Sequence, residues 1–215
     1  MPDEENNFCT IYLVRHGQAE GNAKGILMGH IDLPLTEKGK LQAREVGEKL
    51  KDIHFDAAYS SDLTRARQTA ELILLERKLV IQTSRLIKER SYGVHEGKSR
   101  EKYIKDTEEF HKNLEELIKA GQKVSKYPDG VESDDSISSR MITFIREIAV
   151  ANPNKTILAV THGGILRSFL IRIGFVKEEE FPLLGSLDNG AFVKLLSDGT
   201  DFVIKETSGV HIIHN

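Results

Sequence analysis

The sequence predicts an α/β fold with three layers, α/β/α, built around a mostly parallel sheet with an antiparallel edge strand. Short apolar runs alternate along the chain with amphipathic helical stretches, a pattern typical of parallel strands covered by helices on both faces. Two later runs, residues 190–196 and 202–205, flank Ser197-Asp198-Gly199, which indicates a hairpin and therefore antiparallel pairing. A chain of 215 residues is long enough for one sizeable core, so we expect a single domain over residues 1–215.

The first expected strand runs over residues 8–14 and stops at Arg15-His16-Gly17. Charged residues are rarely buried without a partner, so this tripeptide is expected at the carboxyl end of the strand, where a glycine lets the backbone turn. In open α/β sheets, ligands bind at that end of the strands. Taken alone, the tripeptide is equally consistent with a structural turn. The glycine-rich loop that follows, residues 17–34, is long enough to suggest a functional segment.

The next expected elements are a helix, a short strand and a second helix. Thr36 suits the N-cap of the first helix, and residues 57–60 suit the strand. Ser61 or Asp62 is expected to cap the second helix. Small or apolar residues at helical spacing predict the faces that pack on the sheet: Ala43, Val46, Gly47 and Leu50 in the first helix, and Leu63, Ala66, Ala70 and Ile73 in the second.

The middle of the chain is more polar. Residues 79–83 predict a third strand, and residues 85–98 form a polar segment punctuated by glycines. The highly charged residues 99–117 carry aromatic and leucine side chains at roughly helical intervals, so we expect one or two exposed helices covering the end of the sheet. Pro128-Asp129-Gly130 is a strong turn signal.

The clearest buried strand covers residues 156–161 and ends in His162-Gly163-Gly164. Before it, Ser133 is expected to cap a long helix that Pro153 ends, and after it a helix is expected over residues 165–173. This strand therefore stops, like the first, at a histidine followed by glycine.

Composition and charge give no reason to expect nucleic acid or a membrane as a partner. A net charge of −3 does not favour binding to nucleic acid or to an anionic membrane surface. The one cysteine, Cys9, allows no intramolecular disulfide and suits a buried position in a reducing compartment. Residues 1–7 are acidic and polar, unlike a secretory signal, and no apolar run approaches the roughly 20 residues that span a bilayer. We therefore expect a cytoplasmic protein, and the sequence allows a homodimer without requiring one.

Polar residues follow three of the expected strands at the point where each strand ends. Arg15 and His16 follow the first, Arg65 lies shortly after the second, and His162 follows the strand over residues 156–161. Because the carboxyl ends of parallel strands share one edge of the sheet, these side chains are expected to converge. Guanidinium groups match phosphate oxygens geometrically, and helix N-termini add N–H donors. Two arginines and two histidines around one point therefore predict a phosphate site.

Five blocks of the sequence, in this order, resemble the signature of the histidine phosphatase superfamily, the phosphoglycerate mutase-like group, and in particular its phosphatase branch. The blocks are residues 13–22 (LVRHGQAEGN), 35–39 (LTEKG), 60–70 (SSDLTRARQTA), 89–93 (ERSYG) and 161–163 (THG). The resemblance implies the phosphoglycerate mutase-like fold, a phosphorylated small molecule as substrate, and no metal or other cofactor.

The resemblance also implies a role for each central residue. His16 is expected to be the nucleophile that becomes a phosphohistidine. Arg15 and Arg65 are expected to clamp the transferring phosphoryl group, which His162 also contacts. Glu89 is expected to donate and accept the proton. The chemistry is consistent, because a neutral imidazole is a competent nucleophile and phosphoryl transfer mainly needs positioning and charge neutralisation.

Contacts to the rest of the substrate are expected from a second group of residues. By the resemblance these are Gln18, Asn22, Gly29, Arg90, Tyr92, Arg100 and Gly163. Two positions depart from the pattern of the family. Ala19 stands where a serine or threonine is frequent, and Gly21 stands where many mutases have a bulky aromatic residue. The Gly130-Val131-Glu132-Ser133 block resembles the segment that brings a helix start near the pocket.

Two other classes of function remain as alternatives. Eight histidines suggest a metal-dependent hydrolase, but the H-E-x-x-H pattern is absent, and the close pair His211 and His214 lies at the end of the chain without an adjacent acidic residue. A non-catalytic phosphate-binding protein on the same fold is the second alternative, although the residues expected to perform catalysis are all present.

Within the enzyme class, the choice lies between phosphatase and cofactor-dependent phosphoglycerate mutase. The mutases resemble this chain only with a longer central insertion that supplies extra arginines, whereas residues 99–126 are short and contain Arg100 as their one arginine. Residues 92–98 are similar to fructose-2,6-bisphosphatase-like members. We therefore expect a metal-independent phosphomonoesterase acting on a sugar phosphate or phosphoglycerate type of substrate, with the mutase as the alternative.

Overall fold

A computed structural model describes residues 7–75, 77–120, 127–181 and 186–213. Within these residues six strands form one mixed sheet in the order β3-β2-β4-β1-β5-β6. Four strands are parallel: β1 (Cys9–Arg15), β2 (Ala57–Ser60), β3 (Ile81–Thr83) and β4 (Thr156–Thr161). Two strands at one edge are antiparallel: β5 (Leu187–Ser197) and β6 (Phe202–Val210). The expected strand content, including the final hairpin, is confirmed.

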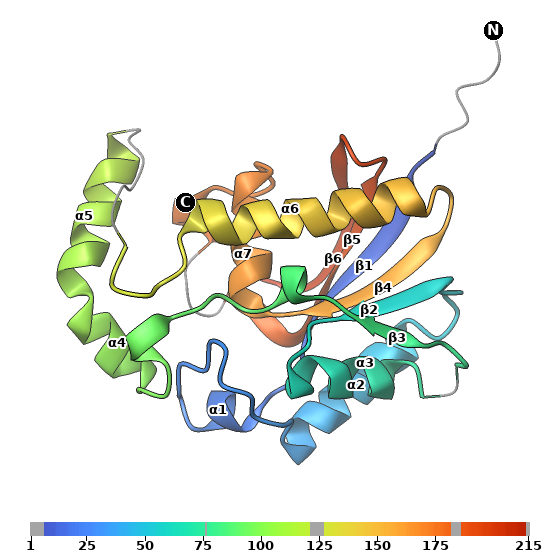
Figure 1. Cartoon of the computed structure of the whole chain (residues 1–215), viewed down its shortest axis with the longest axis horizontal. Helices are drawn as coiled ribbons and strands as arrows, with labels where there is room; N and C mark the ends of the chain where they lie inside the picture. Colours follow the sequence, from blue (N-terminus) through green and yellow to red (C-terminus); the bar gives the residue numbers. More distant parts are fainter. Residues whose placement is uncertain (1–6, 76, 121–126, 182–185, 214–215) are drawn as a thin grey trace, which may run out of the picture.

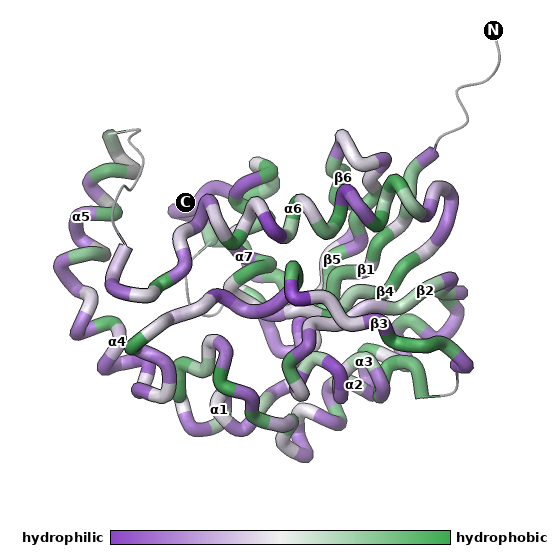
Figure 2. The backbone as a smooth tube through the Cα atoms, viewed as in Figure 1, coloured by the Kyte–Doolittle hydropathy of each residue, from purple (hydrophilic) through white to green (hydrophobic). Residues whose placement is uncertain are grey.

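Helices cover both faces of the sheet, which confirms the predicted three-layer α/β class (Figure 1). On one face lie α2 (Glu37–Lys49) and α3 (Thr64–Ile73), and on the other lie α6 (Asp134–Ala151) and α7 (Gly163–Arg172). Figure 2 shows that apolar stretches follow the central strands, whereas the outer helices alternate between apolar and polar residues. In the described part of the chain, no helix is both long and apolar enough to cross a membrane.

The remaining helices lie in the connections. They are α1 (Glu20–Ala23), α4 (Arg100–Asp106), α5 (Glu108–Lys119), and the 3-10 turns η1 (Arg85–Ile87), η2 (Gly93–His95) and η3 (Glu178–Glu180). The long loop after β1 therefore contains one short helix that the sequence did not predict. As expected for residues 99–117, α4 and α5 lie beyond the end of the sheet (Figure 1).

Two of the three predicted helix caps are confirmed. The hydroxyl of Thr36 accepts a hydrogen bond from the amide of Gly39 at 3.1 Å, and the hydroxyl of Ser133 accepts one from Ser136 at 3.1 Å. The third prediction is wrong, because α3 has Leu63 at its N-cap position rather than Ser61 or Asp62.

The start of α3 is held by a residue from the distant loop after β1. The carboxylate of Asp32 accepts a hydrogen bond from the amide of Thr64 at 2.7 Å. Ser61 accepts instead from the amide of Leu63, at 3.2 Å. The carboxylate of Asp32, from a distant loop, therefore caps the first turn of α3 in place of the local side chain that was expected to do so.

Gly17 allows a close contact between the turn after β1 and the first turn of α2. A Cβ atom on Gly17 would lie only 2.3 Å from the carbonyl oxygen of Gly39, and a Cβ on Gly39 would lie 2.0 Å from the carbonyl oxygen of Gln18. The amide of Gly17 also donates to the hydroxyl of Thr69 in α3 at 3.1 Å. The backbone after His16 is therefore held against both helices on this face.

Candidate active site

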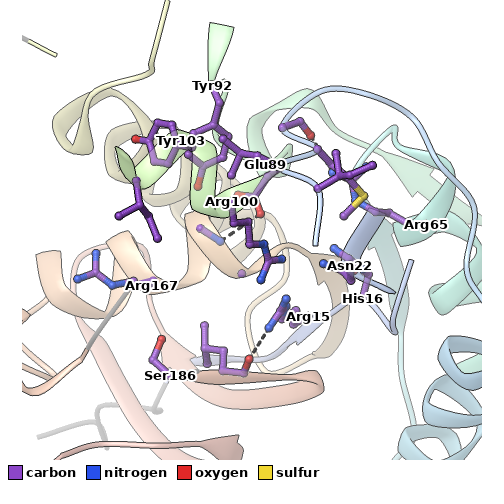
Figure 3. A pocket seen from close by; sticks show the side chains of 18 residues that line it. Arg15, His16, Asn22, Arg65, Glu89, Tyr92, Arg100, Tyr103, Arg167 and Ser186 are labelled. Atoms are coloured by element: carbon purple, nitrogen blue, oxygen red, sulfur yellow. Dashed lines mark hydrogen bonds between the residues drawn. The ribbon is translucent and has the colours of Figure 1, made fainter. Parts of the chain in front are cut away.

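A pocket opens at the carboxyl edge of the parallel strands, as expected for an open α/β sheet (Figure 3). Nine of the residues that the sequence analysis singled out line it: Arg15, His16, Asn22, Gly29, Arg65, Glu89, Tyr92, Arg100 and Gly163. They come from β1, the loop after it, α3, the segment after η1, and the starts of α4 and α7. Segments far apart in the sequence therefore meet around one cavity.

His16 follows β1 directly, and its side chain is almost fully buried. Its Nδ1 atom lies 2.6 Å from the carbonyl oxygen of Gly17, so Nδ1–H donates to that oxygen and the neutral ring keeps its lone pair on Nε2. Burial, with the charges of Arg65 and Arg15, holds the pKa of His16 well below its ordinary value. The ring is therefore uncharged at neutral pH and has a free nucleophilic nitrogen.

Arg15 and Arg65 are anchored by backbone carbonyls. Arg15 donates to the carbonyl oxygen of Leu187 at the start of β5 (dashed in Figure 3), and Arg65 donates to those of Gly29 and Ile31 at 2.8 and 2.9 Å. The Nε atom of each arginine is buried and has no hydrogen-bond partner in the part of the chain that the structure describes. Each fixed guanidinium therefore keeps a donor that a bound anion would satisfy.

Within the described residues, no ion pair balances the charge of Arg15 or Arg65. Among the described residues, the arginines that form ion pairs are Arg85, Arg90, Arg140, Arg167 and Arg172. Arg15, Arg65 and Arg100 thus remain unpaired, and in Figure 3 Arg100 and Arg15 extend toward one another across the pocket. Burial lowers the pKa of Arg15 and Arg65 from the ordinary value. A pocket that gathers positive charge in this way suits a multiply charged anion.

His162 stands beside His16, at the N-cap position of α7. The two ring centroids are 5.0 Å apart, and His162 Nε2 lies 2.7 Å from the hydroxyl oxygen of Ser61. Burial, followed by the charge of Arg65, holds the pKa of His162 well below its ordinary value. The Nδ1 atom is buried and has no hydrogen-bond partner among the residues that the structure describes.

Glu89 places its carboxylate on the N-terminus of α7. The amides of Gly164 and Ile165 donate to it at 3.1 and 3.2 Å, and the amide of Arg90 donates at 2.7 Å. A carboxylate suits this end of the helix because the N–H groups of the first turn have no helical partners. Glu89 therefore faces the pocket from the side of α7 (Figure 3).

Three residues expected in the site, Gln18, Arg90 and His162, are not among those that line the pocket, although His162 lies beside His16. The side-chain oxygen of Gln18 accepts a hydrogen bond from the hydroxyl of Thr36 at 2.9 Å. Arg90 is buried, pairs with the carboxylate of Asp134, and donates to the hydroxyl of Ser168 at 2.7 Å. Glu89 and Arg90 are adjacent in the sequence, yet Glu89 lines the pocket and Arg90 is turned away from it toward Asp134.

Sequence reasoning missed several residues that line the pocket or support it. Arg167 lines it from α7, four positions after Gly163, and its Nε donates to the carbonyl oxygen of Phe181 at 2.8 Å. The i, i+4 spacing on a helix that begins at Gly163 was a usable signal. Ser186 also lines the pocket, but no pattern in the sequence marks it. Ser61 was noted as a helix cap and as part of the 60–70 block but was given no role in the site, although it contacts His162.

The two departures from the family pattern lie beside Asn22 in the loop after β1. The amide of Ala19 donates to the Asn22 side chain at 2.9 Å. A Cβ on Gly21 would lie 2.3 Å from Cγ of Met28, and Met28 lines the pocket. The methionine therefore occupies the space that a larger side chain at position 21 would need.

His211, near the end of the chain, is not among the residues that line this pocket. His211 lies 2.8 Å from a carboxylate oxygen of Asp188, and His214 lies outside the described residues. In the ranges that the structure describes, no three His, Cys, Asp or Glu side chains come together as a possible metal site.

Comparisons with known proteins give a consistent result. The family model described as the histidine phosphatase superfamily (branch 1) matches residues 11–208. A broad-specificity phosphatase of Saccharomyces cerevisiae is 30% identical over 214 residues, covering 94% of this chain and 86% of that protein. A metal-independent phosphoserine phosphatase of Arabidopsis thaliana is 35% identical over 172 residues, covering 79% and 70%. The crystal structure of a phosphoglycerate mutase from Bacillus anthracis superposes with a TM-score of 0.76 at 25% identity, covering 96% and 95%.

Proposed function

Because the chain belongs to the histidine phosphatase superfamily and is a phosphatase, we propose that it hydrolyses small phosphorylated metabolites through a phosphohistidine on His16. The substrate class that we propose is a sugar phosphate or phosphoglycerate type of monoester. The proposal needs no metal, since the pocket supplies its own positive charge. A homodimer and a cytoplasmic location stay predictions from the sequence.

One observation carries the proposal. The hydrogen bond from His16 Nδ1 to the Gly17 carbonyl leaves Nε2 with a lone pair. The ring is close enough to Arg15 and Arg65 for their charges to lower its pKa, and these arginines form no ion pair among the described residues. A neutral nucleophile surrounded by fixed cations is what attack on a dianionic phosphate ester requires, because the cations offset the charge that the ester brings into the pocket.

In the first step, the lone pair of His16 Nε2 forms a bond to phosphorus while the bond between phosphorus and the leaving oxygen breaks. The Glu89 carboxyl group donates its proton to the leaving oxygen, which departs as an alcohol. The N–H donors of Arg15 and Arg65 that have no partner among the described residues support binding of the phosphoryl oxygens. The product of this step is phosphohistidine with an ionised Glu89.

In the second step, a water oxygen forms a bond to phosphorus while the bond between His16 Nε2 and phosphorus breaks. The Glu89 carboxylate accepts a proton from that water. Inorganic phosphate leaves, His16 returns to its neutral form, and Glu89 is again protonated. One carboxyl group thus serves both half-reactions, first as acid and then as base.

A cofactor-dependent phosphoglycerate mutase is the second candidate, and one observation favours it. Arg100 and Arg167 also line the pocket, so positive charge extends beyond the two arginines of the proposed phosphate clamp. A second anionic group, such as a carboxylate or another phosphate, would suit these cations. Turnover of 3-phosphoglycerate to 2-phosphoglycerate that requires a bisphosphorylated primer, without release of phosphate, would identify the mutase.

The proposal is tested by brief incubation with a ³²P-labelled phosphomonoester followed by denaturation. We expect acid-labile, base-stable label on the protein, and neither label nor turnover in His16→Ala. Arg67→Ala is the matched control, because Arg67 lies on α3 near Arg65 but is exposed. Equal labelling or equal turnover in His16→Ala would disprove the role of His16.

The substrate is then identified by a panel that includes 2,3-bisphosphoglycerate, fructose bisphosphates, phosphoserine and α-ribazole phosphate. We expect inhibition by vanadate, which mimics the transferring phosphoryl group, and no loss of activity after treatment with EDTA. Loss of activity in EDTA that added metal restores would favour the metal-dependent alternative.

A further inference from the structure

Two sets of contacts fix the position of Glu89, one to its backbone and one to its carboxylate. The first set is made by the backbone. The guanidinium of Arg140, in α6, donates to the carbonyl oxygens of Leu86, Lys88 and Glu89, with 2.8 Å to Leu86 and 3.0 Å to Glu89. The Glu132 carboxylate binds the same guanidinium at 2.8 and 2.9 Å. The main chain that carries Glu89 is therefore fixed to α6. The loop has little freedom to move, so Glu89 can change position mainly by rotating its side chain.

The second contact is made by the Glu89 carboxylate, which occupies the space that a side chain at position 164 would fill. A Cβ atom on Gly164 would lie 2.5 Å from Oε1 of Glu89 and 3.2 Å from its carboxyl carbon. Contacts below 3.0 Å do not occur between real Cβ atoms and their neighbours, so any other residue at position 164 would displace the carboxylate. The same Gly164 also donates its amide to Glu89.

We propose that Gly164 is a positioning residue for the reaction: its lack of a side chain creates the space in which the Glu89 carboxylate binds the first turn of α7. This inference rests on the proposed role of Glu89 as proton donor and acceptor. Because Arg140 fixes the backbone, a methyl group at position 164 pushes the carboxylate off the amides of Gly164 and Ile165 instead of moving the loop. The proton donor is then misplaced while the arginines and His16 stay where they are.

The experiment compares wild type, Glu89→Gln, Gly164→Ala and the double variant on two phosphomonoesters. An alkyl phosphate has a poor leaving group that needs a proton, whereas p-nitrophenyl phosphate has a good leaving group that needs little assistance. We measure kcat/KM, which reports the first half-reaction, and the inhibition constant of vanadate, which reports binding to the phosphate site.

For Gly164→Ala we expect kcat/KM on the alkyl phosphate to fall about 10- to 100-fold, because a misplacement of about 1 Å can cost that much. Turnover of p-nitrophenyl phosphate falls much less, and vanadate inhibition is unchanged. Adding Gly164→Ala to Glu89→Gln causes no further loss, because the glycine acts through the carboxylate. An equal loss on both esters, weaker vanadate binding, or an additive double variant would overturn the proposal.

Two further variants separate positioning from folding. Gly47→Ala is the matched control, since it adds a methyl group inside α2, near the carbonyl oxygen of Ile73, and should leave the ratio between the two esters at the wild-type value. Arg140→Lys weakens the contacts that hold the backbone of Glu89. It should change the ratio between the two esters in the same direction as Gly164→Ala does. This variant therefore still tests the proposal if Gly164→Ala is unstable.

The design also distinguishes a failure of this inference from a failure of the proposed function. If Glu89→Gln does not lower the alkyl phosphate rate selectively, the proposed role of Glu89 is wrong. If Glu89→Gln shows the selective loss and Gly164→Ala does not, the role of Glu89 stands and the positioning role of Gly164 is wrong.

Discussion

The imidazole rings of His16 and His162 lie edge to face, with their centroids 5.0 Å apart. Each ring is buried, and the charge of Arg65 adds to the effect of burial in lowering the pKa of both groups. The folded protein therefore holds two neutral histidines side by side. In the unfolded chain both histidines take up protons below their ordinary pKa of 6.5.

The first prediction follows from this difference between the folded and unfolded states. Because the pKa of each histidine is lowered on folding, the unfolded state binds more protons below pH 6.5, and stability is lost as the pH falls from there. We expect the free energy of unfolding to fall by about 1.4 kcal/mol per pH unit for each histidine in this range. The slope is about half as large at pH 6.5 itself and vanishes about one pH unit above it, because the unfolded histidines are then neutral as well.

Urea unfolding at pH 7.5, 6.5 and 5.5, in a buffer without phosphate, measures this effect. The double variant His16→Asn/His162→Asn serves as the control and should show a shallower dependence between pH 6.5 and 5.5. Identical slopes for the variant and the wild type would contradict the explanation.

The second prediction concerns Ser61, which accepts from the Leu63 amide and contacts His162 Nε2 at 2.7 Å. When the Ser61 hydroxyl donates to Nε2, a neutral His162 carries its proton on Nδ1, which has no hydrogen-bond partner among the described residues. If His162 contacts the phosphoryl group as the resemblance implies, this is the N–H group that would do so. We expect Ser61→Ala to lower kcat/KM about tenfold and stability by about 1–2 kcal/mol. The matched control is Ser60→Ala, which removes a buried hydroxyl bound to the Ser61 carbonyl and should leave kcat/KM unchanged.

The third prediction concerns Arg65. Its guanidinium binds the carbonyl oxygens of Gly29 and Ile31 and still keeps a buried Nε–H without a partner. A lysine keeps the charge but not the planar set of donors, so Arg65→Lys should lower kcat/KM about 100-fold. Steady-state kinetics on any accepted substrate measures this, with Arg67→Lys as the exposed control on the same helix. Full activity in Arg65→Lys would mean that only its charge matters.

The fourth prediction separates two residues that the resemblance placed together. Arg100 lines the pocket and forms no ion pair in the described part of the chain, whereas Gln18 binds Thr36 away from the pocket. We expect Arg100→Ala to raise KM about tenfold, equivalent to about 1.4 kcal/mol of binding, without lowering the melting temperature. Gln18→Ala should leave KM unchanged. A larger rise in KM for Gln18→Ala than for Arg100→Ala would restore the expectation from the resemblance.

The position of the pocket could be predicted because it depends on topology. Strands that end in Arg15-His16 and in His162 meet at one edge of any parallel sheet, and short-range signals such as the Thr36 cap identify the elements between them. The number and direction of the strands were therefore accessible from periodicity and turns. The roles of the residues in catalysis stay predictions.

Side-chain direction could not be predicted in the same way. Glu89 and Arg90 are adjacent and both polar, yet one faces the pocket and the other is buried against Asp134. Only the packing of α6 and α7 decides which of the two side chains faces the pocket. For the same reason Asp32 could not be recognised as the cap of α3, because its partner Thr64 lies 32 positions along the chain.

The antiparallel strand β5 begins at the same edge where β1 ends, and this sets the order in which the site is assembled. β1 is synthesised first, but both of its neighbours, β4 and β5, come from residues after 155. Arg15 receives its carbonyl partner from Leu187, and the His16 carbonyl receives a hydrogen bond from Asn189 at 3.1 Å. A nascent chain therefore cannot fix Arg15 and His16 in place until these late residues have left the ribosome and paired. Refolding likewise depends on contacts between residues far apart in sequence.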